Sequence, residues 1–170
     1  GKDSILSGPA GGIVGAVQTS KRAGFKRIVT FDMGGTSTDV AHYAGEYERE
    51  LDSEIAGARM RVPVLAIHTI AAGGGSILAF DGASYRVGPE SGGSNPGPAC
   101  YRRGGALTIT DANVMLGKIQ PQYFPAVFSQ DANQPLDREI VLQKFTELTA
   151  TINTATSNNL TPEQVDSGFM

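Results

Sequence analysis

The stretch Ile28-Val29-Thr30-Phe31-Asp32-Met33-Gly34-Gly35-Thr36-Ser37-Thr38-Asp39-Val40 decides how this chain folds. A short apolar run ends in an aspartate, passes two consecutive glycines and resumes as a run rich in Thr and Val. This pattern predicts a β-hairpin from about Arg27 to Tyr43 that turns through a glycine loop. Taken alone, the same residues are equally typical of an ordinary hairpin whose glycines serve only the turn.

The glycine loop has the residue types of a phosphate-binding site. Gly34 and Gly35 lack a Cβ, so they can take positive φ and bring backbone N–H groups close to an anion. Asp32 offers a hard oxygen for Mg²⁺ or for waters bound to it, which makes Asp32 the candidate catalytic and metal-binding residue. The hydroxyls that can reach phosphate oxygens belong to Thr36, Ser37 and Thr38.

The composition argues against several classes of protein. The 170 residues carry a formal net charge of −3, with Lys and Arg scattered, which argues against a nucleic-acid partner. No apolar run is long enough to span a bilayer, and a single cysteine cannot form an internal disulfide, so we expect a cytoplasmic location. P-loop, dinucleotide-binding, nucleophile-elbow and zinc-protease motifs do not occur in the sequence. The chain starts without Met and stops in a predicted helix, so we expect it to be part of a longer protein.

The residues on either side of the hairpin predict further elements. Ser7-Gly8-Pro9 predicts the start of a helix that ends at Gly24. Its internal glycines favour tight packing on a sheet, with direct contact to a ligand as the alternative. A third strand is expected from Glu46 to Ile55, and one buried segment is expected at 59–72, with His68 as a core residue.

Two glycine-rich stretches follow. The amides of Gly73, Gly74 and Gly75 are a second candidate contact for a nucleotide, and a flexible connector is the alternative. A hairpin is expected from Ser76 to Val87. The next stretch, 88–101, has so much Gly and Pro that it predicts a long shaped loop. It presents Glu90 as a candidate catalytic residue, Asn95 as a candidate substrate contact and Cys100 as a packed thiol.

The remaining residues are mainly helical in pattern. A short strand is expected at 107–110, with Asp111 capping the helix after it, and Asp137 caps a longer helix beyond an irregular connector. Thr161-Pro162-Glu163-Gln164 predicts a last helix, which we expect to be poorly ordered. We expect residues 1–128 to form the nucleotide-binding core and 129–170 a helical continuation.

The order of helix, strand, glycine turn and strand resembles the second phosphate loop of the actin, sugar-kinase and heat-shock-chaperone superfamily. This resemblance implies an α/β fold, namely one lobe of a ribonuclease H-like ATPase with a mixed sheet and flanking helices.

A closer resemblance covers most of the chain. It rests on 7–12, 31–40, 71–76, 87–91, 95–101 and 110–113, read in order. These motifs resemble the hydantoinase/oxoprolinase family, in particular the large subunit of hydantoinase A type and the ATP-dependent 5-oxoprolinases. Gly92, Ser94 and Ala106 depart from the residues that are commoner in the family, without putting membership in doubt.

The resemblance implies a function as well as a fold. It implies ATP and Mg²⁺ as cofactors and 5-oxoproline as the cyclic amide that is opened to glutamate after phosphorylation of its amide oxygen. It also implies a first phosphate loop elsewhere in the longer chain, so these residues alone are expected to be inactive, and a hydantoinase B-type subunit or domain as a further partner. The alternatives are an ATP-hydrolysing N-methylhydantoinase, an acetone-carboxylase-like subunit, and an actin-like or chaperone-like domain without amidohydrolase activity.

Overall fold

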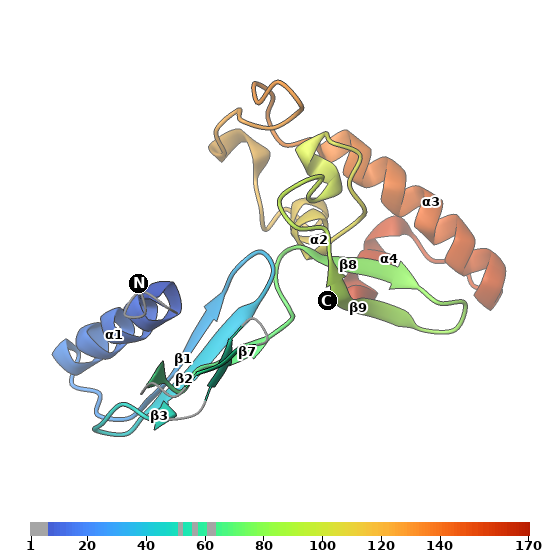
Figure 1. Ribbon diagram of the computed structural model, residues 1–170. Helices are drawn as coiled ribbons and strands as arrows, with labels where there is room; N and C mark the ends of the chain where they lie inside the picture. The colour runs from blue at the N-terminus through green and yellow to red at the C-terminus, as the bar shows by residue number, and fades with distance from the viewer. Residues whose placement is uncertain (1–6, 51–52, 56–57, 61–63) are drawn as a thin grey trace. The chain divides into compact units, whose positions relative to one another are not determined.

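The computed structural model describes residues 7–50, 53–55, 58–60 and 64–170 (Figure 1). The chain divides into two compact units. Unit 1 comprises Gly1–Met33 and Ser37–Ile70, and unit 2 comprises Gly34–Thr36 and Ala71–Met170. The expected boundary after residue 128 does not match this division, because the helices beyond it pack into the core of unit 2.

Unit 1 is a helix packed on a hairpin. Helix α1 (Ser7–Arg22) precedes strands β1 (Ile28–Met33) and β2 (Thr38–Tyr43), which pair antiparallel with Asp32 opposite Asp39. Ile13 and Val17 lie one helical turn apart and are buried in one cluster with Ala41 and Tyr43. The helix and the hairpin predicted from the sequence are therefore confirmed.

The glycines of α1 are not explained by tight packing, which corrects that expectation. A Cβ added to Gly11 or Gly15 would meet no atom within 4 Å. Gly12 alone of the three has a neighbour, the Oδ2 of Asp32 at 3.5 Å from the added Cβ.

The rest of unit 1 consists of short strands. Strand β7 (His68–Ile70) joins the edge of β2, β3 (Arg49–Glu50) pairs with β6 (Val64–Leu65), and β4 (Ser53–Ile55) pairs with β5 (Ala58–Met60).

These short strands correct two expectations. The single strand at 46–55 and the single buried segment at 59–72 are wrong where the structure describes them, and residues 51–52, 56–57 and 61–63 lie outside the described part. His68 is exposed, because β7 is an edge strand, so it is not a core residue. Every strand pair among the described residues is antiparallel, so the expected mixed sheet is not found there.

Unit 2 begins with the predicted hairpin. Strands β8 (Ser76–Phe80) and β9 (Tyr85–Ser91) pair antiparallel, and Asp81 fixes the turn by accepting hydrogen bonds from the amides of Ala83 and Ser84. Strand β9 runs on through Gly88 and Pro89, so the loop expected from residue 88 starts only after Ser91. Proline is tolerated there because, among the strands that the structure describes, β9 pairs only with β8.

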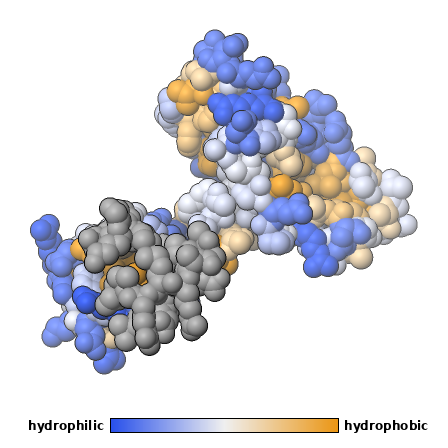
Figure 2. Space-filling model, viewed as in Figure 1, coloured by the Kyte–Doolittle hydropathy of each residue, from blue (hydrophilic) through white to orange (hydrophobic). Residues whose placement is uncertain are grey.

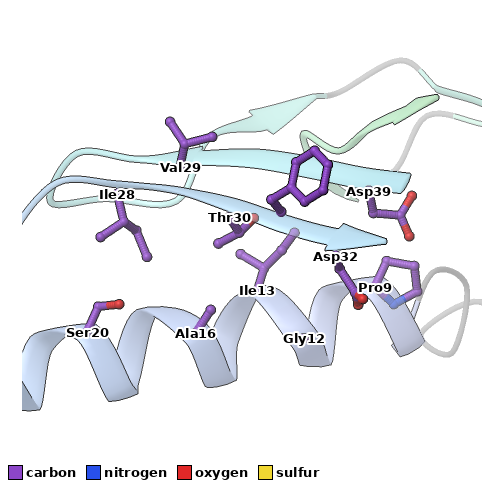
Figure 3. A pocket seen from close by; sticks show the side chains of 11 residues that line it. Pro9, Gly12, Ile13, Ala16, Ser20, Ile28, Val29, Thr30, Asp32 and Asp39 are labelled. Carbon is purple, nitrogen blue, oxygen red and sulfur yellow. The ribbon is translucent and has the colours of Figure 1, made fainter. Parts of the chain in front are cut away.

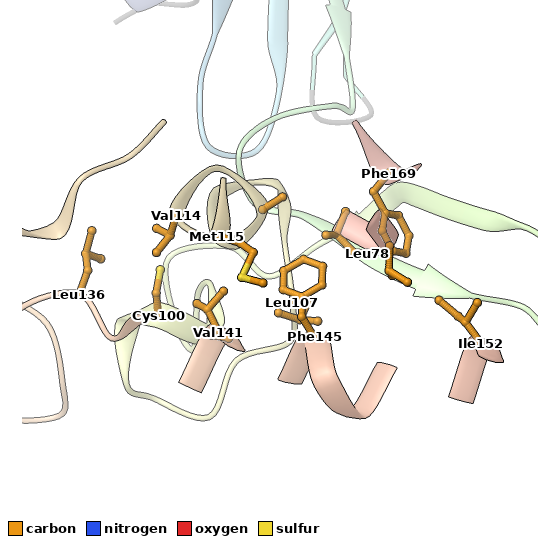
Figure 4. Packing of buried hydrophobic residues seen from close by; sticks show 13 residues of the cluster. Leu78, Cys100, Leu107, Val114, Met115, Leu136, Val141, Phe145, Ile152 and Phe169 are labelled. Carbon is orange, nitrogen blue, oxygen red and sulfur yellow. The ribbon is translucent and has the colours of Figure 1, made fainter. Parts of the chain in front are cut away.

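Three helices cover this hairpin and form one core with it (Figure 4). They are α2 (Ile109–Met115), α3 (Arg138–Thr156) and α4 (Pro162–Phe169), and the loops carry short 3-10 turns at Ala99–Tyr101 and Pro121–Tyr123. The buried side chains include Leu78, Leu107, Val114, Met115, Val141, Phe145, Ile152, Val165 and Phe169. No helix in the described part of the chain is long and apolar enough to cross a membrane.

Two expectations about these helices need correction. Thr108 caps α2 and Asp111 occupies the third helical position of a capping box, while the expected strand at 107–110 reduces to an isolated bridge between Ile77 and Thr108. Helix α4 is packed rather than loose, because Phe169 stacks edge-on against Tyr85 with ring centroids 4.7 Å apart.

Candidate functional site

The loop between β1 and β2 is held by the turn of three glycines. The amide of Gly74 donates to the carbonyl of Gly34 at 3.0 Å, and the amide of Gly75 donates to the carbonyl of Gly35 at 2.6 Å. A trans peptide places its C=O and the following N–H on opposite sides. The N–H groups of Gly35 and Thr36 therefore both point away from the glycine turn.

These two N–H groups are free to bind a ligand. Among the residues that the structure describes, the amides of Gly35, Thr36 and Ser37 donate to no protein atom. Neighbouring backbone donors aimed the same way form an anion-binding surface. The predicted phosphate loop is thus compatible with the backbone geometry.

The turn of three glycines lies so close to the loop between β1 and β2 that the residues of this turn in contact with the loop must be glycine. A Cβ on Gly73 would lie 2.7 Å from the carbonyl oxygens of Gly34 and Gly35, and one on Gly75 would lie 2.8 Å from the oxygen of Gly35. A Cβ on Gly35 would meet nothing within 4 Å. The expectation of positive φ at Gly34 and Gly35 is wrong, so glycine is not needed there for a left-handed backbone conformation. The lack of a side chain instead leaves room for a ligand.

The three supporting glycines do not offer free amides, which corrects part of the prediction for them. Besides the two bonds to the loop, the amide of Gly73 donates to the hydroxyl of Ser76 at 3.0 Å. The carbonyl of Gly74 accepts from both the amide and the hydroxyl of Thr110. Gly73 to Gly75 therefore act as a frame for the loop, with their donors engaged inside unit 2.

Asp32 lies at one end of a cleft between α1 and β1 in unit 1 (Figure 3). The cleft has a volume of about 440 Å³, and its lining includes Pro9, Gly12 and Asp39 near the exposed carboxylate of Asp32. Asp39 stands opposite Asp32 in the strand register, and its Oδ1 accepts a hydrogen bond from the Thr69 hydroxyl at 2.7 Å. Two carboxylates thus lie on the same face of this hairpin, a pairing that the sequence analysis did not single out.

The other predicted polar residues differ in exposure. Thr36 is exposed and Ser37 is half-buried, so both hydroxyls are accessible, whereas Thr38 is only 3% exposed. Glu90 is exposed in β9 of unit 2, and its catalytic role stays a prediction. The described residues contain no cluster of three or more His, Cys, Asp or Glu that would hold a metal by itself.

Asp111 organises the Gly- and Pro-rich loop, a role that its expected place as a helix cap did not indicate. Asp111 is fully buried, and its carboxylate accepts hydrogen bonds from the amides of Ala99, Cys100 and Thr108 and from the Thr108 hydroxyl, at 2.8–3.0 Å. The spacing Thr108 to Asp111 is a capping-box signal that is present in the sequence. Cys100 is buried as predicted, and burial, with the nearby Asp111 carboxylate, raises the pKa of its thiol well above the usual range.

The fold and the glycine loop define a mixed α/β domain of a known family. The chain belongs to the hydantoinase/oxoprolinase family, whose model matches residues 1–170. It is 50% identical to 5-oxoprolinase PfmaA of Pestalotiopsis fici and 48% identical to 5-oxoprolinase of Saccharomyces cerevisiae, in each case over all of this chain. The chain spans 13% of the length of each of these relatives.

Solved structures show the same partial match. The nucleotide-free structure of acetone carboxylase matches 96% of this chain and 22% of its own, with a TM-score of 0.76 and 30% identity. The ATP-dependent caprolactamase of Pseudomonas jessenii matches 96% of this chain and 23% of its own, with a TM-score of 0.73 and 30% identity. The chain thus forms an α/β domain that resembles part of these ATP-dependent enzymes.

Proposed function

We propose that this chain supplies the second phosphate loop of a longer ATP-dependent enzyme that opens 5-oxoproline to glutamate. The observation that carries the proposal is the pair of free amides at Gly35 and Thr36, which belong to the peptides whose carbonyls, Gly34 and Gly35, are held by the glycine turn. In this proposal the domain is one lobe of an actin-like ATPase, and a first phosphate loop outside these residues closes the site.

The reaction requires activation of a stable amide. The lactam oxygen attacks the γ-phosphorus of ATP and ADP leaves. A first water attacks the ring carbon and the bond from this carbon to nitrogen breaks, which gives an acyl phosphate. A second water hydrolyses the acyl phosphate to the carboxylate and phosphate. The nitrogen takes up a proton as the ring opens. Transfer of a phosphoryl group depends mainly on positioning and on charge stabilisation, which backbone amides supply.

The residues of this chain fit the parts of such a site. The amides of Gly35 and Thr36 bind phosphate oxygens, and the hydroxyls of Thr36 and Ser37 add donors beside them. Within unit 1, Asp32 and Asp39 lie opposite each other on the hairpin and carry the carboxylate oxygens that Mg²⁺ prefers. When bound, Mg²⁺ neutralises charge on the phosphates.

The choice of substrate follows from the degree of similarity. Sequence identity to the two 5-oxoprolinases is 48–50% over all of this chain, against 41% over 68% of this chain for the caprolactamase subunit alpha of Pseudomonas jessenii. The structural likeness to acetone carboxylase supports a second candidate function, a carboxylase-type reaction that uses the same phosphate loop.

The test uses the full-length protein that carries this chain. Asp32→Asn removes a carboxylate charge with little change in shape and should lower 5-oxoproline-dependent ATP hydrolysis by at least about a hundredfold. Asp131→Asn, an exposed acid outside the cleft, is the matched control and should retain turnover. Near-normal turnover in Asp32→Asn would refute its role, and glutamate formation measured against carboxylated products separates the two candidate reactions.

A further inference from the structure

A second hollow lies in unit 2, beside the Gly- and Pro-rich loop. It has a volume of about 490 Å³ and is lined by Ser94, Asn95, Arg103 and Gln130. Figure 2 shows hydrophilic surface over the loop that carries Gln130. Among the described residues, the lining contains one cation, two side-chain amides and a hydroxyl, and no carboxylate.

The cation of this pocket is held in a fixed orientation. The Nε of Arg103 donates to the carbonyl of Ser129 at 3.0 Å, and its Nη1 donates to the carbonyl of Ser94 at 3.4 Å. Arg103 is half-buried, and within the described residues it has no carboxylate at ion-pair distance. Its neighbour Arg102 differs, since it pairs with Asp137 at 2.6 Å. The charge of Arg103 is therefore oriented but not neutralised.

The loop that forms the pocket is rigidly framed. A Cβ on Gly105 would lie 1.8 Å from the carbonyl oxygen of Gly97, so these two segments pack directly backbone to backbone. Asp111 anchors the next part of the loop through the amides of Ala99 and Cys100. A preorganised pocket binds its ligand without a large ordering cost.

We propose that this pocket binds the carboxylate of the small cyclic-amide substrate. A guanidinium binds planar oxyanions through parallel N–H groups, and the amides of Asn95 and Gln130 add neutral donors. The volume is in the range of small-molecule sites. This inference rests on the proposed function, because 5-oxoproline carries a carboxylate on its ring. A phosphate group shares the same oxyanion chemistry, so the test must distinguish the two.

The test measures binding to the full-length protein by isothermal titration without nucleotide. The ligands are 5-oxoproline, 2-pyrrolidinone, which is the same ring without the carboxylate, and inorganic phosphate. The variant Gln130→Glu adds a negative charge to the lining at an exposed residue, and Gln122→Glu makes the same change on an exposed residue outside it. The expected result is about a tenfold weaker binding of 5-oxoproline in Gln130→Glu only, with 2-pyrrolidinone unaffected by either change.

Three outcomes would overturn the inference. They are equal binding of 5-oxoproline by Gln130→Glu and Gln122→Glu, equal weakening of 2-pyrrolidinone binding in Gln130→Glu, and binding of inorganic phosphate without any binding of 5-oxoproline. Failure of the proposed function gives a different result. The Gln130→Glu change would then still weaken the binding of 5-oxoproline, but the protein would not open its ring.

Discussion

The substitution Gly73→Ala tests whether the glycine turn supports the phosphate loop. The added Cβ would lie 2.7 Å from the carbonyl oxygens of Gly34 and Gly35, whereas ordinary contacts begin at 3.4 Å, so the backbone must separate by about 0.7 Å. Such overpacking costs about 1–3 kcal/mol. It also strains the hydrogen bonds from Gly74 and Gly75 to the loop, each of which contributes about 1 kcal/mol.

The total expected loss of stability is therefore about 2–5 kcal/mol, which corresponds to a fall in melting temperature of about 5–15 °C for a chain of this size. Thermal unfolding followed by circular dichroism measures it. In the full-length protein the same change should weaken ATP binding, because the peptides that aim the Gly35 and Thr36 amides are displaced.

The matched partner is Gly35→Ala. Its Cβ would meet no protein atom within 4 Å and its φ is not positive, so stability should change by less than about 1 kcal/mol. Affinity for ATP should nevertheless fall at least about tenfold, because the methyl group occupies the space that a phosphate needs. Unchanged stability in Gly73→Ala, or full ATP affinity in Gly35→Ala, would refute this account of the loop.

Three further predictions concern unit 2. Asp111→Asn replaces an acceptor of four hydrogen bonds with an amide that must leave donors unpaired, and should cost about 3 kcal/mol in urea unfolding. Among the described residues, both carboxylate oxygens of Asp166 lack a hydrogen-bond partner, and burial raises its pKa from 3.8 to about 7. Because the unfolded chain releases this proton first, the contribution of Asp166 to stability should be greatest below pH 4 and fall as the pH rises to 7. Asp166→Ala should abolish that fall in pH-dependent melting scans, and the exposed control Asp131→Ala should retain it. The Cys100 thiol should resist iodoacetamide at pH 8 in the folded protein and react once urea unfolds it, because burial raises its pKa.

The elements that the sequence predicted well are those fixed by local interactions. The hairpin around Gly34 and Gly35, helix α1 and the starts of α3 and α4 depend on apolar spacing and on caps that lie within four residues of each other. Asp137 and Thr161 cap their helices as expected, since their side chains accept hydrogen bonds from nearby amides of the same helix.

The misjudged elements depend on partners far away in the chain. The exposure of His68 follows from its place on an edge strand, which no local pattern records. Pro89 remains in a strand because β9 has a free edge, and the apolar spacing of residues 85–91 does not reveal which edge is free. The pairing of Asp32 with Asp39 could have been predicted, because the length of the loop sets the register of the hairpin. The prediction of the hairpin did not extend to these two carboxylates.

The two glycine clusters show most clearly what sequence leaves open. Both Gly34-Gly35 and Gly73-Gly74-Gly75 have the composition of an anion-binding loop, and composition does not tell them apart. An amide whose hydrogen is engaged inside the fold cannot also bind a ligand at full strength. The amides of the second cluster donate to the carbonyls of the first or to Ser76, so the free donors lie on the first cluster alone. Substitutions in the frame should therefore reduce stability and ligand affinity together, while substitutions in the loop should reduce affinity by itself.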